Sequence, residues 1–498
     1  MNILRNGGNA VDAAIAASAT LSVVEPHMTG VGGDCFAIVV EPNGAVHGLN
    51  GSGRAPAAAD PKKLRAHGHM TMPETGALSV TVPGAVKAWQ ALLQRFGSRS
   101  FDEVFAEAIR YAEAGFPVSP RVAWDWLSCE KDLRTDEGAA KHWLLAGEAP
   151  KVGQRFQAPA LGATLRAITR GGADEFYNGE IGQEIARTIQ AKGGALTHAD
   201  LAQVSVDWVR PISTTFGGLD ILELPPNGQG ITALVLLRVL EALDVRSHPP
   251  SSSGRYHIEI EAARLAYSVR DRLLGDQASM TIDVDPLLSD EFIEGLVNQF
   301  DPKARISDLD LPPPAQSNTV YLTVVDRERR SVSFINSIYD AFGSGIVTPK
   351  SGFALQNRGA CFSLKPGHPN ELRPRKRPLH TIMPGMAVAK GRAAISFGVV
   401  GGAFQPMGHA HILCNMLTYG MDPQEAVDHP RAFWDAHGRV LLEASISSEI
   451  RSELRMVGHN VCEAAGPHGC GQIVQIDDRA GFLIGGSDSR KDGQAIGW

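Results

Sequence analysis

Two kinds of apolar pattern alternate along the chain and predict a protein that mixes helices with strands. Residues 10–24 are almost entirely alanine and aliphatic residues and follow Asn9, a residue type that caps helices, so they predict a buried helix. Residues 84–114, rich in Ala, Arg, Glu and Leu, predict further helices. A short apolar run predicts a strand at residues 36–40, and further strands are predicted at residues 219–224, 320–326, 331–337, 394–400 and 472–476.

A polar tetrapeptide, residues 327–330, separates two of these strands and is short enough to predict a hairpin. Ahead of the hairpin, residues 301–317 change from charged residues to a stretch with three consecutive prolines, 312–314. Prolines donate no backbone hydrogen bond and disfavour helix before them, so this stretch predicts an exposed, extended linker. Asn318 and Thr319 follow it directly.

Composition narrows the class of protein. A chain of 498 residues with 43% hydrophobic and 20% charged residues can bury a substantial core, as about three domains or one large unit, which excludes disorder. A formal net charge of -7 provides no basic field for nucleic acid. The six cysteines show no CxxC spacing, which predicts reduced, mostly buried thiols.

The location of the chain is expected to be cytoplasmic. No apolar run is long enough to span a membrane, and no secretory signal is visible. Residues 3–8 look like the last turn of a helix closed by glycine, and so short a helix would be marginal. We therefore leave open that a natural N-terminal segment, with any export signal, precedes Met1.

Several common chemistries have no signature in this sequence. It contains no GxSxG, GxGxxG, Walker A or HExxH motif, and the turn at residues 30–34 lacks the third glycine of a phosphate loop, so it predicts a tight packing turn. His409 and His411 form a weak metal pattern and are better interpreted as surface or core residues. We predict neither a metal ion nor a cofactor.

The junction between Asn318 and Thr319 offers one chemistry that needs no triad. A threonine after an accessible linker can attack the carbonyl before it, shift the amide to an ester, and become a new N-terminus on hydrolysis. Its α-amine, with a reference pKa of about 7.7–8.0, can then accept the hydroxyl proton. Taken alone, Thr319 is more often an ordinary strand residue.

Several motifs around this junction resemble the γ-glutamyltranspeptidase family over nearly the whole chain. They are residues 7–14 (GGNAVDAA), 82–84 (VPG), 112–118 (AEAGFPV), Thr319 with 324–326 (VVD), 342–345 (FGSG), 376–379 (KRPL) and Gly401-Gly402. The resemblance implies an α+β fold, the four-layer αββα sandwich of N-terminal-nucleophile hydrolases. It also implies self-cleavage into a large subunit, 1–318, and a small subunit, 319–498, that stay together as a heterodimer; further dimerisation is left open.

The resemblance assigns catalytic roles position by position. Thr319 matches the nucleophile, and Ser337 stands where the family has a threonine that hydrogen-bonds to it. Gly401 and Gly402 match the pair whose N–H groups bind the oxyanion, with a plain turn as the alternative.

The departures from the family concern substrate binding. Ser52 stands at the position of the arginine that clamps the γ-glutamyl carboxylate, with Arg54 two residues on, and Cys361 replaces the aspartate that holds the ammonium group. Further substitutions at substrate positions are Tyr339, Arg358, His380 and Thr381, and a family Pro-Pro-Ser-Ser segment becomes residues 225–230 (PPNGQG). An ammonium group has lost its counter-ion, whereas two arginines remain for a carboxylate.

Three functions therefore stay open. The pattern resembles the branch of the family with oxamate amidohydrolase and cephalosporin-acylase-like members, which favours an autoprocessed amidohydrolase of a small carboxylate-bearing substrate. The alternatives are a true glutathione hydrolase or γ-glutamyltransferase, and an uncleaved, non-catalytic relative. None of the three requires nucleic acid or a membrane as a partner.

Overall fold

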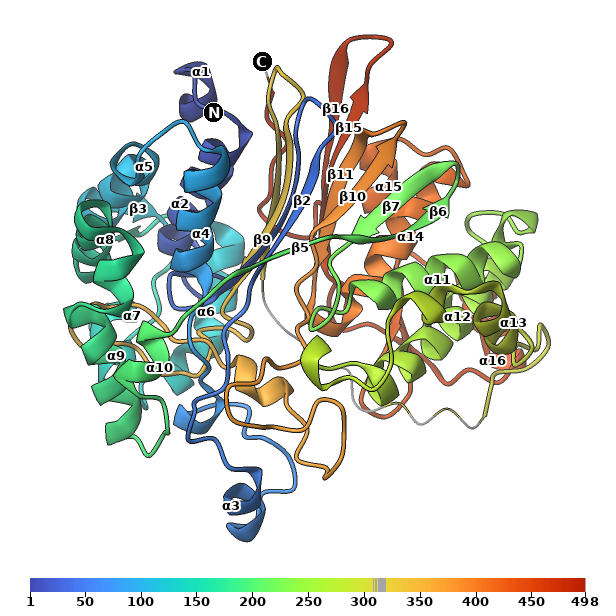
Figure 1. Ribbon diagram of the computed structural model, residues 1–498. Helices are drawn as coiled ribbons and strands as arrows, with labels where there is room; N and C mark the ends of the chain where they lie inside the picture. Colours follow the sequence, from blue (N-terminus) through green and yellow to red (C-terminus); the bar gives the residue numbers. More distant parts are fainter. Residues whose placement is uncertain (308, 310, 312–318, 498) are drawn as a thin grey trace.

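The protein consists of two β-sheets packed face to face, with a layer of helices on the outer face of each (Figure 1). The computed structural model describes residues 1–307, 309, 311 and 319–497. The prolines predicted to form an extended linker lie outside the described residues. So does Asn318, which was predicted to precede the cleaved bond. The four-layer αββα fold expected from the sequence is confirmed.

The first sheet has the order β5-β2-β1-β9-β8, with antiparallel neighbours throughout. Its strands are β1 (Asp34–Val40), β2 (Val46–Gly51), β5 (Asp207–Val209), β8 (Val320–Val325) and β9 (Ser331–Ser337). The β8–β9 hairpin predicted from the sequence is confirmed, and its turn places Arg329 in the left-handed region, with φ 68°. Because β8 is an edge strand, Thr319 sits at the rim of this sheet.

Helices α1 to α10 belong to the layer beside this sheet or to the loops around it. They are α1 (Asn2–Arg5), α2 (Ala10–Val24), α3 (Pro61–Ala66), α4 (Ala85–Phe96), α5 (Phe101–Ala114), α6 (Pro120–Leu133), α7 (Glu137–Trp143), α8 (Pro159–Tyr177), α9 (Glu180–Ala191) and α10 (His198–Ala202), with η1 (Ala77–Ser79) and the small ribbon β3 (Phe116–Pro117) and β4 (Arg155–Phe156). The side chain of Asn9 accepts from the N–H groups of Val11 and Asp12, so the predicted cap and the bounds of α2 are confirmed.

The second sheet has the order β16-β15-β11-β10-β7-β6, also antiparallel. Its strands are β6 (Ile212–Phe216), β7 (Leu219–Glu223), β10 (Gly385–Ala389), β11 (Arg392–Val400), β15 (Cys470–Asp477) and β16 (Phe482–Ser487). Its outer layer contains α11 (Gly230–Ala242), α12 (Ser253–Leu273), α13 (Asp290–Val297), α14 (Gln405–Leu417), α15 (Pro423–Asp428), α16 (Ser448–Met456), η2 (Val245–Ser247), η3 (Gln277–Ser279), η4 (Asp285–Leu288) and the strands β12 (Ala432–Trp434), β13 (Val440–Leu442) and β14 (Val461–Glu463). Two further 3-10 turns, η5 (Arg358–Cys361) and η6 (Gly402–Phe404), lie near the sheets' ends.

Three apolar layers hold the sandwich together. One lies between the first sheet and its helices and contains Trp89 and Phe105, and another lies between the second sheet and helices α11, α12 and α14. The third, with Phe36, Ile335 and Met386, fills the space between the sheets. Strand β1 is buried on both faces and is apolar after Asp34, whereas β9 is equally buried although Ser331, Ser333, Asn336 and Ser337 are polar.

The glycine turn before β1 brings two strands' backbones into close contact. A Cβ on Gly33 would lie 2.2 Å from the carbonyl oxygen of Ser337, and a Cβ on Gly32 would lie 2.1 Å from that of Ala354. The packing turn expected at residues 30–34 is therefore confirmed, and it fixes the backbone at the end of β9.

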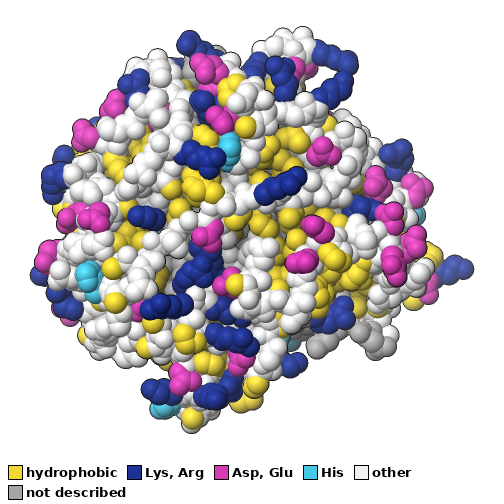
Figure 2. Space-filling model, viewed as in Figure 1, with side chains coloured by type: hydrophobic (Ala, Val, Ile, Leu, Met, Phe, Trp, Pro, Cys, Tyr) yellow, Lys and Arg dark blue, Asp and Glu magenta, His cyan; other side chains and the backbone are white. Residues whose placement is uncertain are grey.

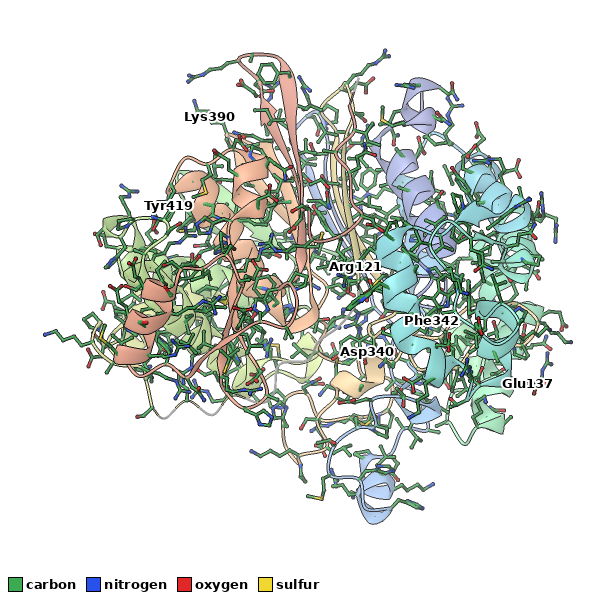
Figure 3. All side chains as sticks on the ribbon, turned by 180° about the vertical axis from the view of Figure 1, so that it is seen from behind. Arg121, Glu137, Asp340, Phe342, Lys390 and Tyr419 are labelled. Atoms are coloured by element: carbon green, nitrogen blue, oxygen red, sulfur yellow. The ribbon has the colours of Figure 1, made fainter. Side chains whose placement is uncertain are left out.

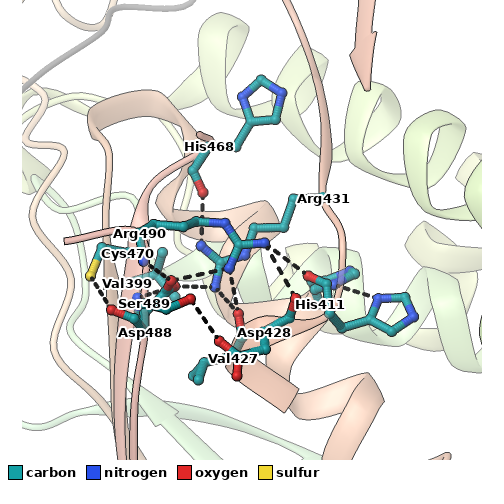
Figure 4. A network of polar contacts seen from close by, with 12 residues as sticks. Val399, His411, Val427, Asp428, Arg431, His468, Cys470, Asp488, Ser489 and Arg490 are labelled. Carbon is teal, nitrogen blue, oxygen red and sulfur yellow. Dashed lines mark hydrogen bonds and ion pairs between the residues drawn. The ribbon is translucent and has the colours of Figure 1, made fainter. Parts of the chain in front are cut away.

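Buried polar contacts join the helices of the second sheet's outer layer to its strands and to one another. His409 contacts Glu223, and His411 contacts Glu259, so both are core histidines. Close by, Arg431 joins the carbonyl of His468 to the carboxylate of Asp488 and so secures the C-terminal segment (Figure 4).

The surface mixes the two signs of charge. On the face that Figure 2 shows, Lys and Arg side chains are interspersed with Asp and Glu side chains. Of the six cysteines, Cys35, Cys414 and Cys470 are buried and the other three are half-buried, so the expectation of mostly buried thiols holds for half of them. Every helix among the described residues is too short or too polar to cross a bilayer.

Candidate active site

The site is centred on Thr319, which immediately precedes β8 and is buried. The β8–β9 register pairs Val320 with Asn336, so Thr319 comes to lie opposite Ser337, the last residue of β9. Its Oγ1 donates a hydrogen bond to the Ser337 Oγ at 3.1 Å. The hydroxyl pair expected from the sequence is therefore in contact, on two strands whose positions the sheet fixes.

Arg358 approaches the same hydroxyl pair from η5. Its Nη2 donates to Ser337 Oγ at 3.2 Å, and its Nη1 donates to Thr381 Oγ1 at 2.7 Å. The guanidinium is fully buried, and its Nε has no hydrogen-bond partner among the described residues. No carboxylate of the described chain forms an ion pair with it. A buried cation without a counter-ion is costly, so this position favours an incoming anion.

Tyr339 covers the other face of this arginine. The Arg358 guanidinium carbon lies 4.3 Å from the centre of the Tyr339 ring, a cation–π contact. Tyr339 has a φ of 81°, and its N–H donates to Ser337 Oγ at 2.9 Å. Removal from water raises the pKa of both the Tyr339 phenol and the Cys361 thiol, so both groups are neutral near pH 7.

Asp340, next along the chain, is the acidic residue beside this cluster. Its Oδ2 accepts from Asn357 Nδ2 at 2.6 Å, which places it next to η5 in the middle of the molecule (Figure 3). Burial raises the pKa of the Asp340 carboxyl, and the hydrogen bond from Asn357 and the charge of Arg358 lower it. The charge of Arg358 acts on this carboxyl through the electrostatic field, and the two side chains form no ion pair in the described structure.

His380 is buried beside the site with both ring nitrogens engaged. Nε2 lies 3.0 Å from Asp34 Oδ2, and Nδ1 accepts from the N–H of Ile382 at 3.3 Å. Burial, followed by the field of Arg358, lowers the pKa of His380 to about 4. Because both nitrogens of this neutral ring have partners within the fold, neither is free to bind a ligand. The fixed ring also restrains the next residue, Thr381, whose hydroxyl accepts a hydrogen bond from Arg358.

The glycine pair follows β11 and begins η6. Gly401 has φ 127° and Gly402 has φ 57°, conformations that favour glycine. Among the described residues their N–H groups donate to no other group. The carbonyl of Gly402 accepts from Gln229 Nε2 at 3.0 Å, and the same nitrogen donates to the carbonyl of Thr381 at 2.8 Å. Gln229 thus connects the glycine turn with the arginine and hydroxyl cluster.

Two of the predicted substrate residues lie apart from this cluster. Ser52 is buried, and its hydroxyl donates to Asn50 Oδ1 at 2.7 Å and accepts from Asn227 Nδ2 at 3.2 Å. Arg54 lies 3.6 Å from Asp276 and 3.8 Å from Asp207. Both residues line a cavity of about 310 Å³ whose wall includes Arg375 but neither Thr319 nor Ser337.

Sequence reasoning missed three residues that organise the site. Asp34 accepts from the N–H groups of Gly53 and Gly84, each at 3.0 Å, besides holding His380. Gln229, the residue before α11, donates to the carbonyl of Gly402, and Arg270 on α12 donates to Gln229. Gln229 stood in the segment that departs from the family, but nothing distinguished Arg270 on a helix with many charged residues. In the described part of the chain, no group of three or more His, Cys, Asp or Glu residues could hold a metal ion.

Comparison with known proteins agrees with this geometry. The γ-glutamyltranspeptidase family model matches residues 1–498. The chain is 37% identical to a glutathione hydrolase-like proenzyme, YwrD, of Bacillus subtilis, covering 99% of this chain and 95% of that protein. It is 33% identical to the oxamate amidohydrolase proenzyme of Klebsiella pneumoniae, covering 100% and 95%. The structure of cephalosporin acylase from Bacillus halodurans superposes with a TM-score of 0.94, at 38% identity over 100% of this chain and 93% of that one.

The αββα sandwich, with a threonine at the start of an edge strand, defines the class of N-terminal-nucleophile hydrolases. Within that class, the chain belongs to the γ-glutamyltranspeptidase family. It is an enzyme of the amide-hydrolysing kind that this family comprises.

Proposed function

We propose that the chain cleaves itself before Thr319 and then hydrolyses an amide in a small substrate that carries a carboxylate. In the first step, Thr319 Oγ1 bonds to the carbonyl carbon of residue 318, the carbon–nitrogen bond breaks, and the hydroxyl proton passes to the Thr319 nitrogen. Water then hydrolyses the ester, giving fragments 1–318 and 319–498, which stay associated because both contribute strands to each sheet.

In the proposed catalytic cycle, the freed α-amine of Thr319 takes the hydroxyl proton as Oγ1 attacks the substrate amide. The N–H groups of Gly401 and Gly402 bind the oxyanion, and the proton passes to the leaving amine as the acyl ester forms. Water resolves this ester. Ser337, 3.1 Å from Thr319 Oγ1, orients the nucleophile.

One observation carries the choice of substrate: the Arg358 guanidinium is fully buried beside the nucleophile without a carboxylate partner. A substrate carboxylate would supply the missing charge and could accept from Nε, which has no partner among the described residues. The neutral Cys361 thiol, where the family has an ammonium-binding aspartate, disfavours a γ-glutamyl group. The name of the oxamate-hydrolysing relative supports the same substrate class. Arg54 and Ser52, on a neighbouring cavity, would contact only a larger leaving group.

The test compares two substrates on the processed enzyme. We expect turnover of oxamate, or of another small amide with an adjacent carboxylate, and little turnover of γ-glutamyl-p-nitroanilide. Strong turnover of the γ-glutamyl compound with none of the carboxylate amides would instead identify a glutathione hydrolase or γ-glutamyltransferase. A single uncleaved chain without either activity would identify a non-catalytic relative.

A further inference from the structure

A buried arginine on α12, Arg270, supports the glycine turn through two separate side chains. Its Nη1 donates to Gln229 Oε1 at 3.0 Å, and its guanidinium carbon lies 4.4 Å from the centre of the Tyr267 ring. Gln229 donates to the carbonyl of Gly402, and the Tyr267 hydroxyl donates to the carbonyl of Ala403. Arg270 therefore supports, through Gln229 and Tyr267, the consecutive carbonyls of Gly402 and Ala403, which adjoin the proposed oxyanion donors.

The orientation of the Gln229 amide follows from its partners. An arginine can only donate, so the oxygen of the amide must face Arg270 and the nitrogen must face the carbonyls of Thr381 and Gly402. Both N–H bonds of Gln229 are used in this way, and its side chain is fully buried. The amide therefore has one arrangement that satisfies every partner.

The glycine turn needs such support because its backbone is intrinsically soft. Gly401 and Gly402 both have positive φ, and glycine visits these conformations and many others at similar energy. Donors for an oxyanion stabilise it only when they are fixed in advance at the place where charge develops. The carbonyl of Gly402 lies in the peptide unit adjoining the one that carries the Gly402 N–H, so holding that carbonyl restricts the movement of the proposed donor.

We propose that Gln229, Tyr267 and Arg270 form a positioning device for the oxyanion turn, called here the α12 bracket. This inference rests on the proposed function, since the oxyanion is assigned to Gly401 and Gly402. Gln229 and Tyr267 touch no reacting atom and act through the backbone of the turn. Gln229 also holds the backbone of Thr381, whose hydroxyl binds Arg358, so the bracket links the oxyanion donors to the anion-binding arginine.

The decisive variant is Gln229→Glu, which keeps the shape of the side chain and its contact with Arg270 but turns the donating nitrogen into an acceptor. We expect kcat to fall about 100-fold to 1000-fold, the loss typical of one misplaced oxyanion donor, with KM changed less than threefold. Tyr267→Phe removes only the second arm, and we expect a smaller loss of kcat, about threefold to tenfold.

Asn415→Asp provides the matched control. Asn415 is also a buried amide between an arginine and a backbone carbonyl, here Arg255 and Ala426, but it contacts neither glycine. A purely structural role for Gln229 predicts equal losses of thermal stability and of kcat in both variants. The bracket predicts a loss of kcat in Gln229→Glu alone, and kcat within threefold of wild type in that variant would overturn it.

Hydrogen exchange separates failure of the bracket from failure of the proposed function. In Gln229→Glu, amide exchange in the peptide covering residues 398–404 should accelerate at least tenfold, and in Asn415→Asp it should not change. Hydrogen exchange does not depend on activity. It therefore still tests the α12 bracket if Gln229→Glu stays uncleaved or if the wild type hydrolyses no amide. Unchanged exchange at the glycine turn refutes the bracket in that case too.

Discussion

Replacing Arg358 with methionine should separate activity from stability. The guanidinium donates to the hydroxyls of Ser337 and Thr381, and neither bond involves a charged partner. Because the guanidinium is charged, each of these hydrogen bonds contributes about 1.5–3 kcal/mol. Removing a buried cation that has no ion-pair partner relieves a desolvation penalty of several kcal/mol. The two effects are of similar size, so we expect Arg358→Met to leave the free energy of unfolding nearly unchanged.

Activity, by contrast, should fall. Loss of one partner from a buried charge pair costs about 2–5 kcal/mol, so kcat/KM for a carboxylate amide should fall roughly 30-fold to several thousand-fold. The assay uses the cleaved fraction of wild type and Arg358→Met, each with the carboxylate amide and with its methyl ester. The ester has no charge to lose, so its turnover should change by less than tenfold. An equal loss for both substrates, or a clear loss of stability, would refute the anion-binding role of Arg358.

Three further predictions concern the nucleophile, the packing turn and a buried histidine. Thr319→Ala should remain one full-length chain on a denaturing gel, whereas Thr319→Ser should still be cleaved, more slowly; cleavage of the alanine variant would remove the assigned nucleophile. Gly33→Ala should cost about 1–3 kcal/mol of stability in urea titrations and slow self-cleavage, because the added Cβ would lie 2.2 Å from the carbonyl of Ser337. Gly295→Ala is its control, since a Cβ there meets open space in a helix and should not destabilise. Burial lowers the pKa of His429 to about 3, so between pH 6.5 and 3 the unfolded chain binds more protons and the stability contributed by this residue is lost on acidification. From pH 7.5 to 5.5 the wild type should lose about 1.4 kcal/mol more than His429→Asn; parallel pH curves for the two proteins would contradict this.

The pattern of apolar residues was sufficient for the elements that the site depends on. Residues 10–24 are the helix α2, residues 331–337 are the strand β9, and the five residues between β8 and β9, 326–330, form the turn of a hairpin. The helix was predictable because a capping residue precedes an apolar run, and the hairpin because a short polar segment separates two strand-forming segments. The family resemblance placed Ser337 beside Thr319, and the hairpin register seen in the structure sets the two residues opposite each other.

The rest of the site was decided by contacts between segments far apart in the sequence. Arg358 Nη1 and Thr381 Oγ1 lie 2.7 Å apart, and Gln229 joins Thr381 to Gly402, although these residues belong to four different segments. The same holds for predicted substrate residues that the structure engages elsewhere: Arg54 lies beside Asp207 and Asp276, and both ring nitrogens of His380 already have partners within the fold. A side chain's partners depend on which groups the packed layers bring within hydrogen-bonding distance. The sequence determines which residue types are available for such contacts. Only the tertiary structure determines which charged or polar groups surround each of these side chains.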